Sequence, residues 1–354
     1  MNDRMIISLP ISPYDKMSVG RMTTPILGES ISKSMNCKFI MAINVLNSYK
    51  NKNYSGFINL MNNYNINPNQ YWIDNQHVKE MMNQIYILNE MGYICEKEKK
   101  IVRCTCGKVE ISKDNISTIN LKDSLFGIKN DEYYCKFCKS KWVIGNEKVL
   151  VFDSKLVDKT NMKFYPDFIN KDKTTFDKTV GNNDVVISRN RSTGIIINYK
   201  GHKYNLDIDF LWQNYLSLFK EKERIVMCGN HQLYQLYMVG MLEQCFNNNN
   251  NTIYLATPYL EQSKDEYALN NRAMSLKVFS LLILKWAKKE NTIDKSLLNY
   301  INSMNIDKKQ MLYDIIIEKI DTTENIIDDL KYVLTKKYNF QNANKELKRR
   351  RRNV

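Results

Sequence analysis

Residues 9–27 read LPISPYDKMSVGRMTTPIL, and this stretch carries the strongest fold signal in the sequence. It overlaps a short apolar run, Met5–Leu9, that is typical of a buried strand, and Pro10 ends that run. Thr24 followed by Pro25 fits an N-cap and a first helical position, so we expect a helix to begin there. A strand, a glycine-containing loop and a helix in this order aim backbone N–H groups and a helix N-terminus at one place. Phosphate binds at such places in α/β proteins.

Strand and helix patterns alternate along the rest of the chain. Apolar residues recur with helical spacing over Asn67–Tyr93 and between Leu233 and Leu242, and the pattern is helical from Arg272 onward. Short apolar runs predict further strands at Val149–Phe152, Asp184–Ile187, Gly194–Tyr199, Arg224–Cys228 and Thr252–Ala256. Strands that alternate with helices favour a parallel sheet, so the expected fold class is α/β, with a C-terminal all-α region.

Four of the eight cysteines form two close pairs, which read Cys104-Thr-Cys106-Gly107 and Cys135-Lys-Phe-Cys138. Two such pairs, about thirty residues apart, suit a tetrahedral zinc site of four thiolates, and the glycine fits the tight turn of a zinc knuckle. Four protein ligands leave no open position, so the predicted role of the metal is structural. Chance clustering of thiols in a reducing compartment is the alternative. The remaining cysteines are expected to be buried thiols: Cys37, Cys95, Cys228 and Cys245.

Composition excludes several classes of protein. Apolar residues make up 43% and aromatic residues 11% of the 354 residues, which suffices for a packed core and excludes a disordered or fibrous chain. The longest apolar stretch is far shorter than the roughly 20 residues of a membrane span. The N-terminal residues also lack the apolar core of a signal peptide. We therefore expect a soluble, cytoplasmic protein without a membrane partner.

The chain is strongly basic. Its 52 Lys and Arg against 38 Asp and Glu give a formal net charge of +14. The positive charge is most concentrated at Lys345–Arg352, which read KELKRRRR. This balance favours a polyanionic partner, with tRNA or other RNA as the natural candidate. A solvated surface on a chain rich in Lys and Asn is the alternative.

The quoted stretch resembles the ATP-binding opening of class I aminoacyl-tRNA synthetases, most of all the methionyl, leucyl, isoleucyl and valyl subgroup. In that family a strand and a Pro-rich loop lead into His-x-Gly-His, whose histidines hydrogen-bond the phosphates. Here Ser18-Val19-Gly20-Arg21 stands at that place. Gly20 is kept, where the backbone lies close to the adenine. Ser18 retains one hydrogen-bond donor, and Arg21 is a permanent cation with a donor fork that suits phosphate.

Other segments resemble the same family in the same order. The insert with paired cysteines resembles its methionyl-type zinc knuckle, and Val186–Ile195 resembles the segment that follows it. Asp207–Leu216 resembles a helix that lines the amino-acid pocket. Met227–His231 stands where the family has a strand that ends in Gly-Lys-Asp beside the ribose. Glu261–Asp265 is the best match to the mobile Lys-Met-Ser-Lys-Ser loop, although two acids have entered it.

The resemblance implies an ATP-dependent ligase. It would form an acyl-adenylate from a carboxylic acid, most naturally an amino acid, and would transfer the acyl group to tRNA or to a small acceptor. The implied cofactors are ATP and a structural Zn²⁺. The implied site residues are catalytic Ser18, Arg21 and Lys264; nucleotide-binding Pro13, Tyr14, Gly20, Gly229, His231 and Ser263; pocket residues Trp212 and Tyr215; and metal ligands Cys104, Cys106, Cys135 and Cys138.

The same residues also allow different interpretations. Trp212, Tyr215 and His231 fit a packed core as well as a pocket. His77 and His202 have no carboxylate or cysteine at ligand spacing, so we expect them at the surface. The whole chain could instead be a catalytically degenerate synthetase paralogue that binds RNA or nucleotides. A nucleotidyltransferase of the wider superfamily would fit the strand–loop–helix opening, and so would an unrelated Rossmann-like domain.

The resemblance also implies a division of the chain. Residues 1–102 and 146–272 would form the two halves of a catalytic domain, with the zinc-binding insert at 103–145 between them. A helical region at 273–340 and a basic tail at 341–354 would follow. The implied fold is thus a Rossmann-like, parallel-sheet nucleotide-binding domain with a zinc-knuckle insert and a C-terminal all-α region.

Overall fold

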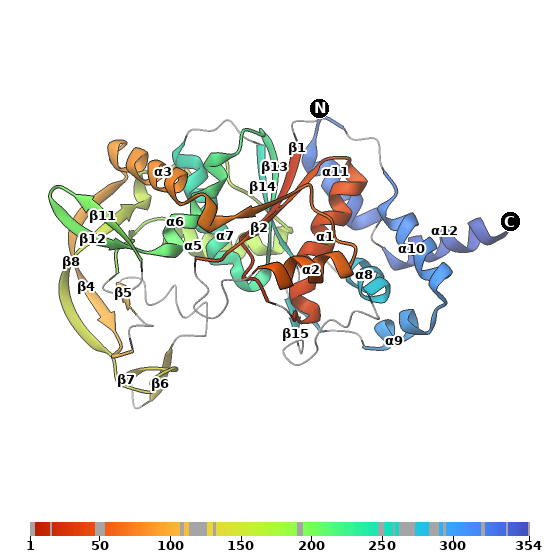
Figure 1. Ribbon diagram of the computed structural model, residues 1–354, viewed down its shortest axis with the longest axis horizontal. Coiled ribbons are helices and arrows are strands. Elements are labelled where there is room, and N and C mark those ends of the chain that lie inside the picture. Colours follow the sequence, from red (N-terminus) through yellow and green to blue (C-terminus); the bar gives the residue numbers. More distant parts are fainter. Residues whose placement is uncertain are drawn as a thin grey trace.

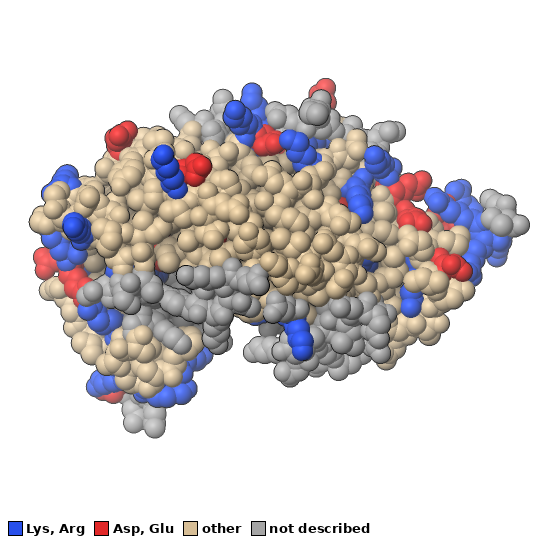
Figure 2. Space-filling model, viewed as in Figure 1, with Lys and Arg blue, Asp and Glu red and all other residues tan. Residues whose placement is uncertain are grey.

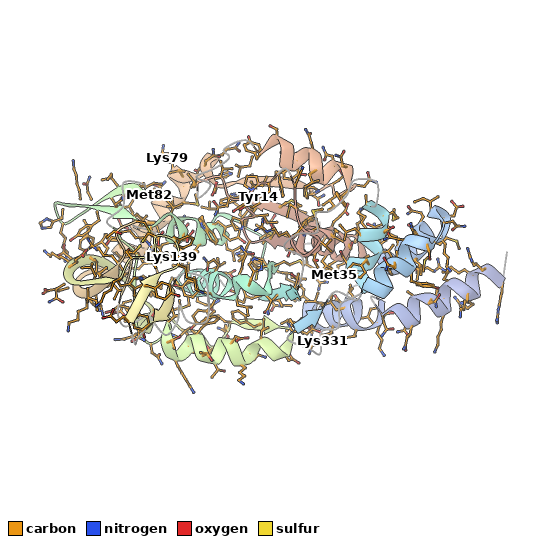
Figure 3. All side chains as sticks on the ribbon, turned by 90° about the horizontal axis from the view of Figure 1, so that it is seen from below. Tyr14, Met35, Lys79, Met82, Lys139 and Lys331 are labelled. Carbon is orange, nitrogen blue, oxygen red and sulfur yellow. The ribbon has the colours of Figure 1, made fainter. Side chains whose placement is uncertain are left out.

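The computed structural model is elongated, with three regions side by side (Figure 1). A parallel sheet with its helices lies in the middle, antiparallel strands lie at one end, and the C-terminal helices lie at the other. In the view turned by 90°, Tyr14 lies between Lys139, at the end with the antiparallel strands, and Lys331, on the side of the C-terminal helices (Figure 3). The structure describes residues 4–14, 16–46, 54–106, 110–112, 126–129, 132–189, 194–246, 251–257, 259–261, 273–282, 290–292, 295–319, 323–337 and 339–352.

The central sheet has six parallel strands in the order β3-β2-β1-β13-β14-β9. Their bounds are β1 (Arg4–Ser8), β2 (Lys38–Ile43), β3 (Gln70–Ile73), β9 (Lys163–Tyr165), β13 (Glu223–Gly229) and β14 (Asn251–Thr257). The parallel sheet expected from the alternating pattern is thus confirmed. The strand order reverses between β1 and β13, because β2 and β3 lie on one side of β1 while β13 and β14 lie on the other. Ligands bind at such switch points in open α/β sheets.

Helices cover both faces of this sheet, because its strands are apolar on both sides. On β1, Ile6 joins the core on one face, whereas Met5 and Ile7 join the core on the other. The first core lies under α1 (Val19–Met35) and α2 (Ser55–Asn63). The second lies under α3 (Val78–Glu90), α5 (Asn170–Thr179), α6 (Ile208–Gln213) and α7 (Leu233–Cys245). Short 3-10 helices are η1 (Asp74–Gln76), η3 (Ser154–Leu156), η4 (Asp167–Ile169), η5 (Tyr215–Leu218) and η6 (Asn230–Gln232).

Helix α1 begins earlier than expected. Its first residue is Val19, and Ser18 is the extended residue before it, with φ −67° and ψ 158°. The predicted helix start at Pro25 is therefore wrong, since Pro25 lies inside α1. The carbonyl of Ser18 accepts hydrogen bonds from Arg21 N–H at 3.0 Å and from Met22 N–H at 3.1 Å. Residues of α1 before the proline already belong to the apolar face that packs on the core. Met22, for example, is fully buried, and this burial favours a helix that begins upstream of Pro25.

The segment expected as one helix over residues 67–93 divides into a strand and a helix. Strand β3 occupies its first part, where Trp72 pairs with Ala42 of β2, and α3 follows. Pairing at the edge of the sheet overrides the helical spacing, because it buries Trp72 to 2% exposure. His77, expected at the surface, instead stacks on Trp72 with ring centroids 5.2 Å apart. His202 is exposed, as expected.

The strands expected at residues 149–152, 184–187 and 194–199 belong to antiparallel sheets and not to the central one. Strand β8 (Val143–Asp153) pairs with β4 (Ile94–Arg103) and β10 (Asp184–Val186), and β4 also pairs with β5 (Glu110–Ser112). Two hairpins join β6 (Phe126–Lys129) to β7 (Glu132–Cys135) and β11 (Ile195–Tyr199) to β12 (His202–Leu206). A short apolar run predicts a strand but not its direction, so the sequence pattern does not distinguish parallel from antiparallel pairing here.

The C-terminal region is mainly helical, as expected. Its helices are α8 (Ala273–Leu282), α9 (Lys295–Ser303), α10 (Ile306–Ile317), α11 (Ile326–Tyr332), the π-helical η8 (Val333–Lys337) and α12 (Phe340–Arg352). It also contains a short strand, β16 (Glu290–Thr292), which pairs with β15 (Tyr259–Glu261) and corrects the expectation of an all-α region. Among the helices in the described parts of the chain, none is long and apolar enough to cross a membrane.

Buried ion pairs attach the C-terminal helices to the sheet. Arg4, at the start of β1, lies 2.8 Å from Asp329 of α11 and also pairs with Glu223 of β13. Lys277 of α8 lies 3.1 Å from Glu29 of α1. Because a buried charge that loses its partner is strongly destabilising, these pairs fix where the helical region docks.

Another buried ion pair joins α7 to the central strands. Arg224 of β13 and Glu243 of α7 lie 2.9 Å apart, and each side chain is only 1% exposed. Arg224 also donates to the Phe219 carbonyl at 2.6 Å. The carboxylate of Glu243 accepts from the hydroxyls of Tyr254 at 2.6 Å and Thr252 at 2.8 Å. Both charges are thus surrounded by hydrogen-bond partners, which is what makes their burial tolerable.

We expect Glu243→Ala to lower the free energy of unfolding by about 3–5 kcal/mol, because it leaves the Arg224 charge buried without its anion. Thr252→Val is the matched control, since it removes one hydrogen bond to the same carboxylate and should cost about 1 kcal/mol. Urea unfolding followed by circular dichroism measures both. Equal losses of unfolding free energy in the two variants would show that the unpaired Arg224 charge does not determine the effect of Glu243→Ala.

Candidate functional site

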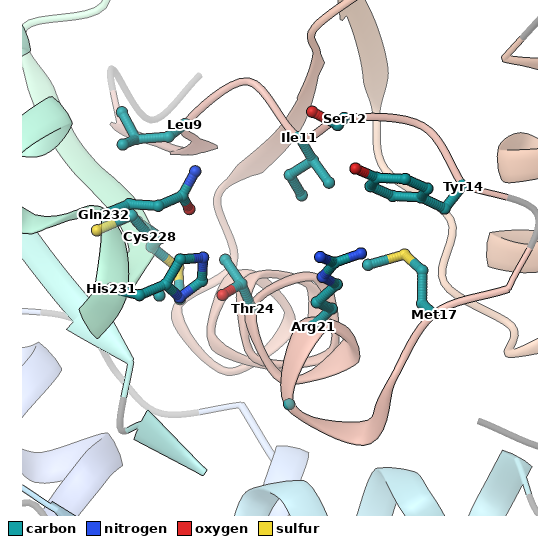
Figure 4. Close-up of a pocket in the computed structure, with 13 residues that line it drawn as sticks. Leu9, Ile11, Ser12, Tyr14, Met17, Arg21, Thr24, Cys228, His231 and Gln232 are labelled. Atoms are coloured by element: carbon teal, nitrogen blue, oxygen red, sulfur yellow. The ribbon is translucent and has the colours of Figure 1, made fainter. Parts of the chain in front are cut away.

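A pocket opens where the strand order reverses, at the carboxyl ends of β1 and β13 (Figure 4). The loop after β1, the first turns of α1, the end of β13 and η6 form its walls, and it holds about 610 Å³ including its open mouth. Two segments far apart in the sequence thus meet at one place. The lining residues are Leu9, Ile11, Ser12, Tyr14, Met17, Gly20, Arg21, Thr24, Met227, Cys228, Gly229, His231 and Gln232.

Backbone hydrogen bonds hold the loop after β1 against the edge of the pocket. Leu9 N–H donates to the Met227 carbonyl at 2.7 Å, and Ile11 N–H donates to the Ala42 carbonyl at 2.9 Å. These bonds continue the pairing of β1 with both of its neighbours. The loop therefore leaves the sheet only after Ile11, and it carries Tyr14 to the mouth of the pocket.

The N-terminus of α1 makes the pocket positive. Gly20 and Arg21 from its first turn line the pocket, and that turn holds no acidic residue. The guanidinium carbon of Arg21 lies 4.6 Å from the centroid of the Tyr14 ring, a cation–π contact that holds the flexible side chain over the opening. Among the lining residues that the structure describes, none is Asp or Glu, and Arg21 carries the one permanent charge. A helix N-terminus and a cation together favour an anion.

His231 forms the opposite wall. Partial desolvation, and then the charge of Arg21, lower the pKa of its imidazole below the ordinary value, although the residue remains exposed to solvent. The neutral ring therefore predominates at pH 7. The ring lies against the backbone of Gly229, where a Cβ would come within 2.8 Å of it. A side chain at position 229 would therefore have to displace this ring, whereas the backbone angles of Gly229 are those of extended chain.

Two threonines fix the distance between the helix and the strand ends. The hydroxyls of Thr24 in α1 and Thr257 at the end of β14 lie 3.1 Å apart. Thr257 also donates to the carbonyl of Cys228 in β13 at 3.1 Å. This chain of hydrogen bonds runs through the floor of the pocket, so α1 and β13 present their ends in a fixed relation.

Four of the six predicted nucleotide-binding residues lie together at this pocket, with the predicted catalytic residue Arg21. Tyr14, Gly20, Arg21, Gly229 and His231 line it. These residues belong to two segments that are far apart in the sequence, and the pairing of β1 with β13 brings the two segments together.

Other predicted residues lie beside the pocket or outside the described part of the chain. Pro13 is buried in the loop, and Ser18 is half-buried just before α1, where its side chain makes no capping hydrogen bond. Neither is among the lining residues. Ser263 and Lys264 lie outside the residues that the structure describes.

Trp212 and Tyr215 are packed in the core on the face of the sheet that α7 covers. Trp212 is 3% exposed and its indole N–H donates to Asp209 at 3.0 Å. Tyr215 is fully buried, and its hydroxyl donates to the carbonyl of Ser8 at the end of β1, 3.0 Å away. Neither residue is among those that line the pocket, and both have the surroundings of core residues.

Sequence reasoning missed several lining residues. They lie at strand ends, in the loop after β1, in α1 and in η6. Most of their side chains are apolar and are typical of ordinary core positions. The one usable signal was their place in the chain, directly beside the predicted motifs. They are Leu9, Ile11, Ser12, Met17, Thr24, Met227, Cys228 and Gln232.

The four clustered cysteines converge in a way that fits zinc. All four sulfur atoms lie within 4.8 Å of one another, with Cys104 and Cys106 3.1 Å apart and Cys106 and Cys135 3.7 Å apart. Four sulfurs about 2.3 Å from a tetrahedral zinc ion would lie about 3.8 Å from each other. Cys104, Cys106, Cys135 and Cys138 could therefore hold the ion with little movement.

The surroundings of this cluster favour thiolates and a structural role. The Ser140 hydroxyl, 2.8 Å from the Cys138 sulfur, is the main cause that lowers the pKa of this thiol to about 5. The Tyr133 and Trp142 rings stack 5.2 Å apart beside the cluster. In the part of the insert that the structure describes, they form a small apolar cluster with Val102, to which a metal would add stability.

The other cysteines divide into two kinds. Cys228 and Cys245 are buried, as expected, whereas Cys37 and Cys95 are only half-buried. The prediction of burial is thus wrong for the second pair, because a cysteine at the end or the edge of an element retains a path to solvent.

Comparisons with known proteins support the architecture. No protein-family model matches the chain, and no curated protein matches it in sequence. Among solved structures, it is similar to Mycobacterium tuberculosis methionyl-tRNA synthetase in complex with methionyl-adenylate, with a TM-score of 0.64, 11% identity, and coverage of 89% of this chain and 72% of that chain. A second structure of that enzyme, bound by methionyl-adenylate, has a TM-score of 0.65 and 12% identity, with coverage of 88% of this chain and 72% of that chain. Its apo form has a TM-score of 0.61 and 12% identity, with coverage of 89% of this chain and 69% of that chain. The chain therefore has a class I aminoacyl-tRNA synthetase-like fold.

We expect the purified protein to carry about one equivalent of zinc, as measured by elemental analysis. Cys135→Ser should lose the metal and lower the thermal stability of the insert, because a structural metal contributes folding free energy directly. Cys95→Ser, which changes a half-buried cysteine outside the cluster, is the control and should keep the metal. Well under half an equivalent of zinc in the parent protein would contradict the assignment.

Proposed function

We propose that this protein is an ATP-dependent ligase that activates a carboxylic acid, most naturally an amino acid, as an acyl-adenylate. It would then transfer the acyl group to tRNA or to a small acceptor. The observation that carries the proposal is the pocket at the switch point, where the N-terminus of α1 and Arg21 face a space lined by no described acidic residue. Two similar structures hold methionyl-adenylate, which adds support for an adenylate as the ligand class.

The geometry suits this chemistry. In activation, a carboxylate oxygen attacks the α-phosphorus of ATP, the bond to the bridging oxygen breaks, and pyrophosphate leaves. Negative charge shifts over the phosphoryl oxygens, so preorganised donors stabilise the transition state. The N–H groups of the first turn of α1 and the guanidinium of Arg21 would supply these donors. Apolar side chains such as Leu9 and Met227 would border the less polar parts of the nucleotide.

The altered signature changes the chemistry of the site without removing its charge. A histidine near pH 7 is mostly neutral, whereas Arg21 is charged at every accessible pH. Ser18 stands at the other substituted position and keeps a hydroxyl. The site would therefore hold phosphate by a fixed charge and would not use a titrating imidazole from α1.

An RNA partner is supported by the surface of α12. This helix buries Ala343 and Leu347 against the C-terminal core, and its second part, Lys345–Arg352, is basic. Glu346 pairs with Arg349 and Arg350. Lys and Arg gather at this end of the molecule (Figure 2). Four further cations of the helix are exposed: Lys345, Lys348, Arg351 and Arg352.

The competing function is a degenerate synthetase that binds RNA without activating a substrate. The two lost histidines favour it, and so does the basic surface of α12, which needs no active site. The two functions differ in ATP binding and in ATP–pyrophosphate exchange across a panel of amino acids. Exchange with any one acid establishes the ligase, whereas an absence of ATP binding at millimolar concentration leaves only the binding protein.

We expect Arg21→Ala to weaken ATP binding by about 1–3 kcal/mol, the scale of a charge-assisted hydrogen bond, in a calorimetric titration. Arg21→His restores the family residue and should retain more affinity than alanine. Lys16→Ala is the matched control, because Lys16 is an exposed cation of the same loop that does not line the pocket. If Arg21→Ala and Lys16→Ala bind ATP equally well, Arg21 is not a phosphate ligand.

Replacing the four exposed cations of α12 by glutamine should flatten the salt dependence of RNA binding. Each lost phosphate contact removes about 0.7–0.9 from the slope of log affinity against log salt. A filter-binding titration at several salt concentrations measures it. A control with the same change in net charge replaces exposed lysines of other helices and should leave the slope unchanged: Lys79, Lys155, Lys171 and Lys178. Equal slopes in the two variants would mean that α12 is only a solvated helix.

A further inference from the structure

We infer that His231 is a second phosphate ligand of the pocket, which binds the anion opposite Arg21 and takes up a proton when the anion binds. The inference rests on the proposed function, because it concerns the same ligand. The inference goes beyond the proposed function because it assigns His231 a charge that changes when the ligand binds. The pocket would then hold its ligand by one permanent cation and one conditional cation.

The placement of the two side chains supports this role. Arg21 comes from α1 and His231 from η6, directly after β13, and they lie on opposite sides of the pocket with Thr24 between them (Figure 4). The hydrogen bonds of Thr24 and Thr257 hold these two walls in register. The imidazole cannot retreat toward the strand, because it already lies against Gly229. An anion at the N-terminus of α1 would therefore meet donors from two rigid walls.

The charges around the imidazole explain why its protonation depends on the ligand. The titratable lining residues described are Tyr14, Arg21, Cys228 and His231 itself, from the loop after β1, α1, β13 and η6, and no lining residue described is an acid. In the free pocket a proton on the exposed His231 would face the like charge of Arg21 across the pocket, and partial desolvation also disfavours it. A bound phosphate opposes the effect of the Arg21 charge, because an adjacent anion favours the charged imidazole.

The direction of the pH effect follows from linkage. Near pH 7 the His231 imidazole is mainly unprotonated in the free protein, and in the proposed complex it is protonated. Proton uptake on binding makes affinity rise as the pH falls, and the gain ends once the free imidazole is itself protonated. The alternative is that the ring only fills space against Gly229, in which case the proton count on binding does not involve His231.

Calorimetric titration with ATP at about pH 6 and about pH 8 separates these alternatives. The parent protein should lose more affinity over this range than His231→Gln, by a further factor of about three to ten. Comparison with the variant removes the ionisation of ATP itself, which is common to both proteins. Repeating the titration in two buffers of different ionisation enthalpy should show up to about one proton fewer taken up by the variant.

Gln232→Ala is the matched control, since Gln232 also lines the pocket but does not titrate, and its pH dependence should equal that of the parent. His231→Asn replaces His231→Gln if the latter does not fold. No ATP binding by the parent overturns the proposed function. Binding with the same pH dependence and proton count in the parent and the His231 variant leaves the proposed function standing and overturns this inference.

Discussion

Burial of β1 on both of its faces positions every other layer of the molecule. All five residues of this strand are buried, and it has a parallel neighbour on each edge. Its side chains alternate between two separate cores, one under α1 and one under α7. Helices must cover both faces to complete these cores, and the reversal of strand order beside β1 then leaves an opening at its carboxyl end. The pocket is thus a consequence of the sheet and not an addition to it.

The two ends of β1 serve different purposes. At the amino end, Arg4 is tied to Asp329 and Glu223, which fixes the C-terminal helices against the sheet. At the carboxyl end, Leu9 leads into the loop that borders the pocket. The charges at the first end are paired and structural, whereas the Arg21 charge at the second end faces an open pocket. A strand of five residues therefore separates the ion pairs that hold the fold from the cation that is offered to a ligand.

The sequence predicts features that depend on particular side chains, such as metal ligands, or on the spacing of neighbouring residues. It does not predict features that depend on which distant segments pair in the folded protein. The spacing of Cys104 and Cys106 predicted their convergence with a distant second pair, because a metal site demands particular atoms. Pro25 predicts the wrong start for α1, because proline is most common at the first position of a helix. In this protein it lies inside the helix, and the neighbouring residues do not distinguish the two cases. The helical spacing over residues 67–93 likewise hides strand β3, since only its pairing with β2 reveals it. Aromatic residues such as Trp212 carry no mark that distinguishes a pocket wall from a core.

The position of β1 beside β13 has a consequence for how the chain is made. Arg4 and Glu223, which pair across this edge, are 219 residues apart in the sequence. At a synthesis rate of about 5–20 residues per second, about 10–40 s pass between the appearance of the two strands. During that interval the central strand of the finished sheet has one bare edge, the kind of surface that invites pairing with another chain. The edge of β1 that β13 covers in the finished sheet therefore stays open during synthesis until β13 has been made.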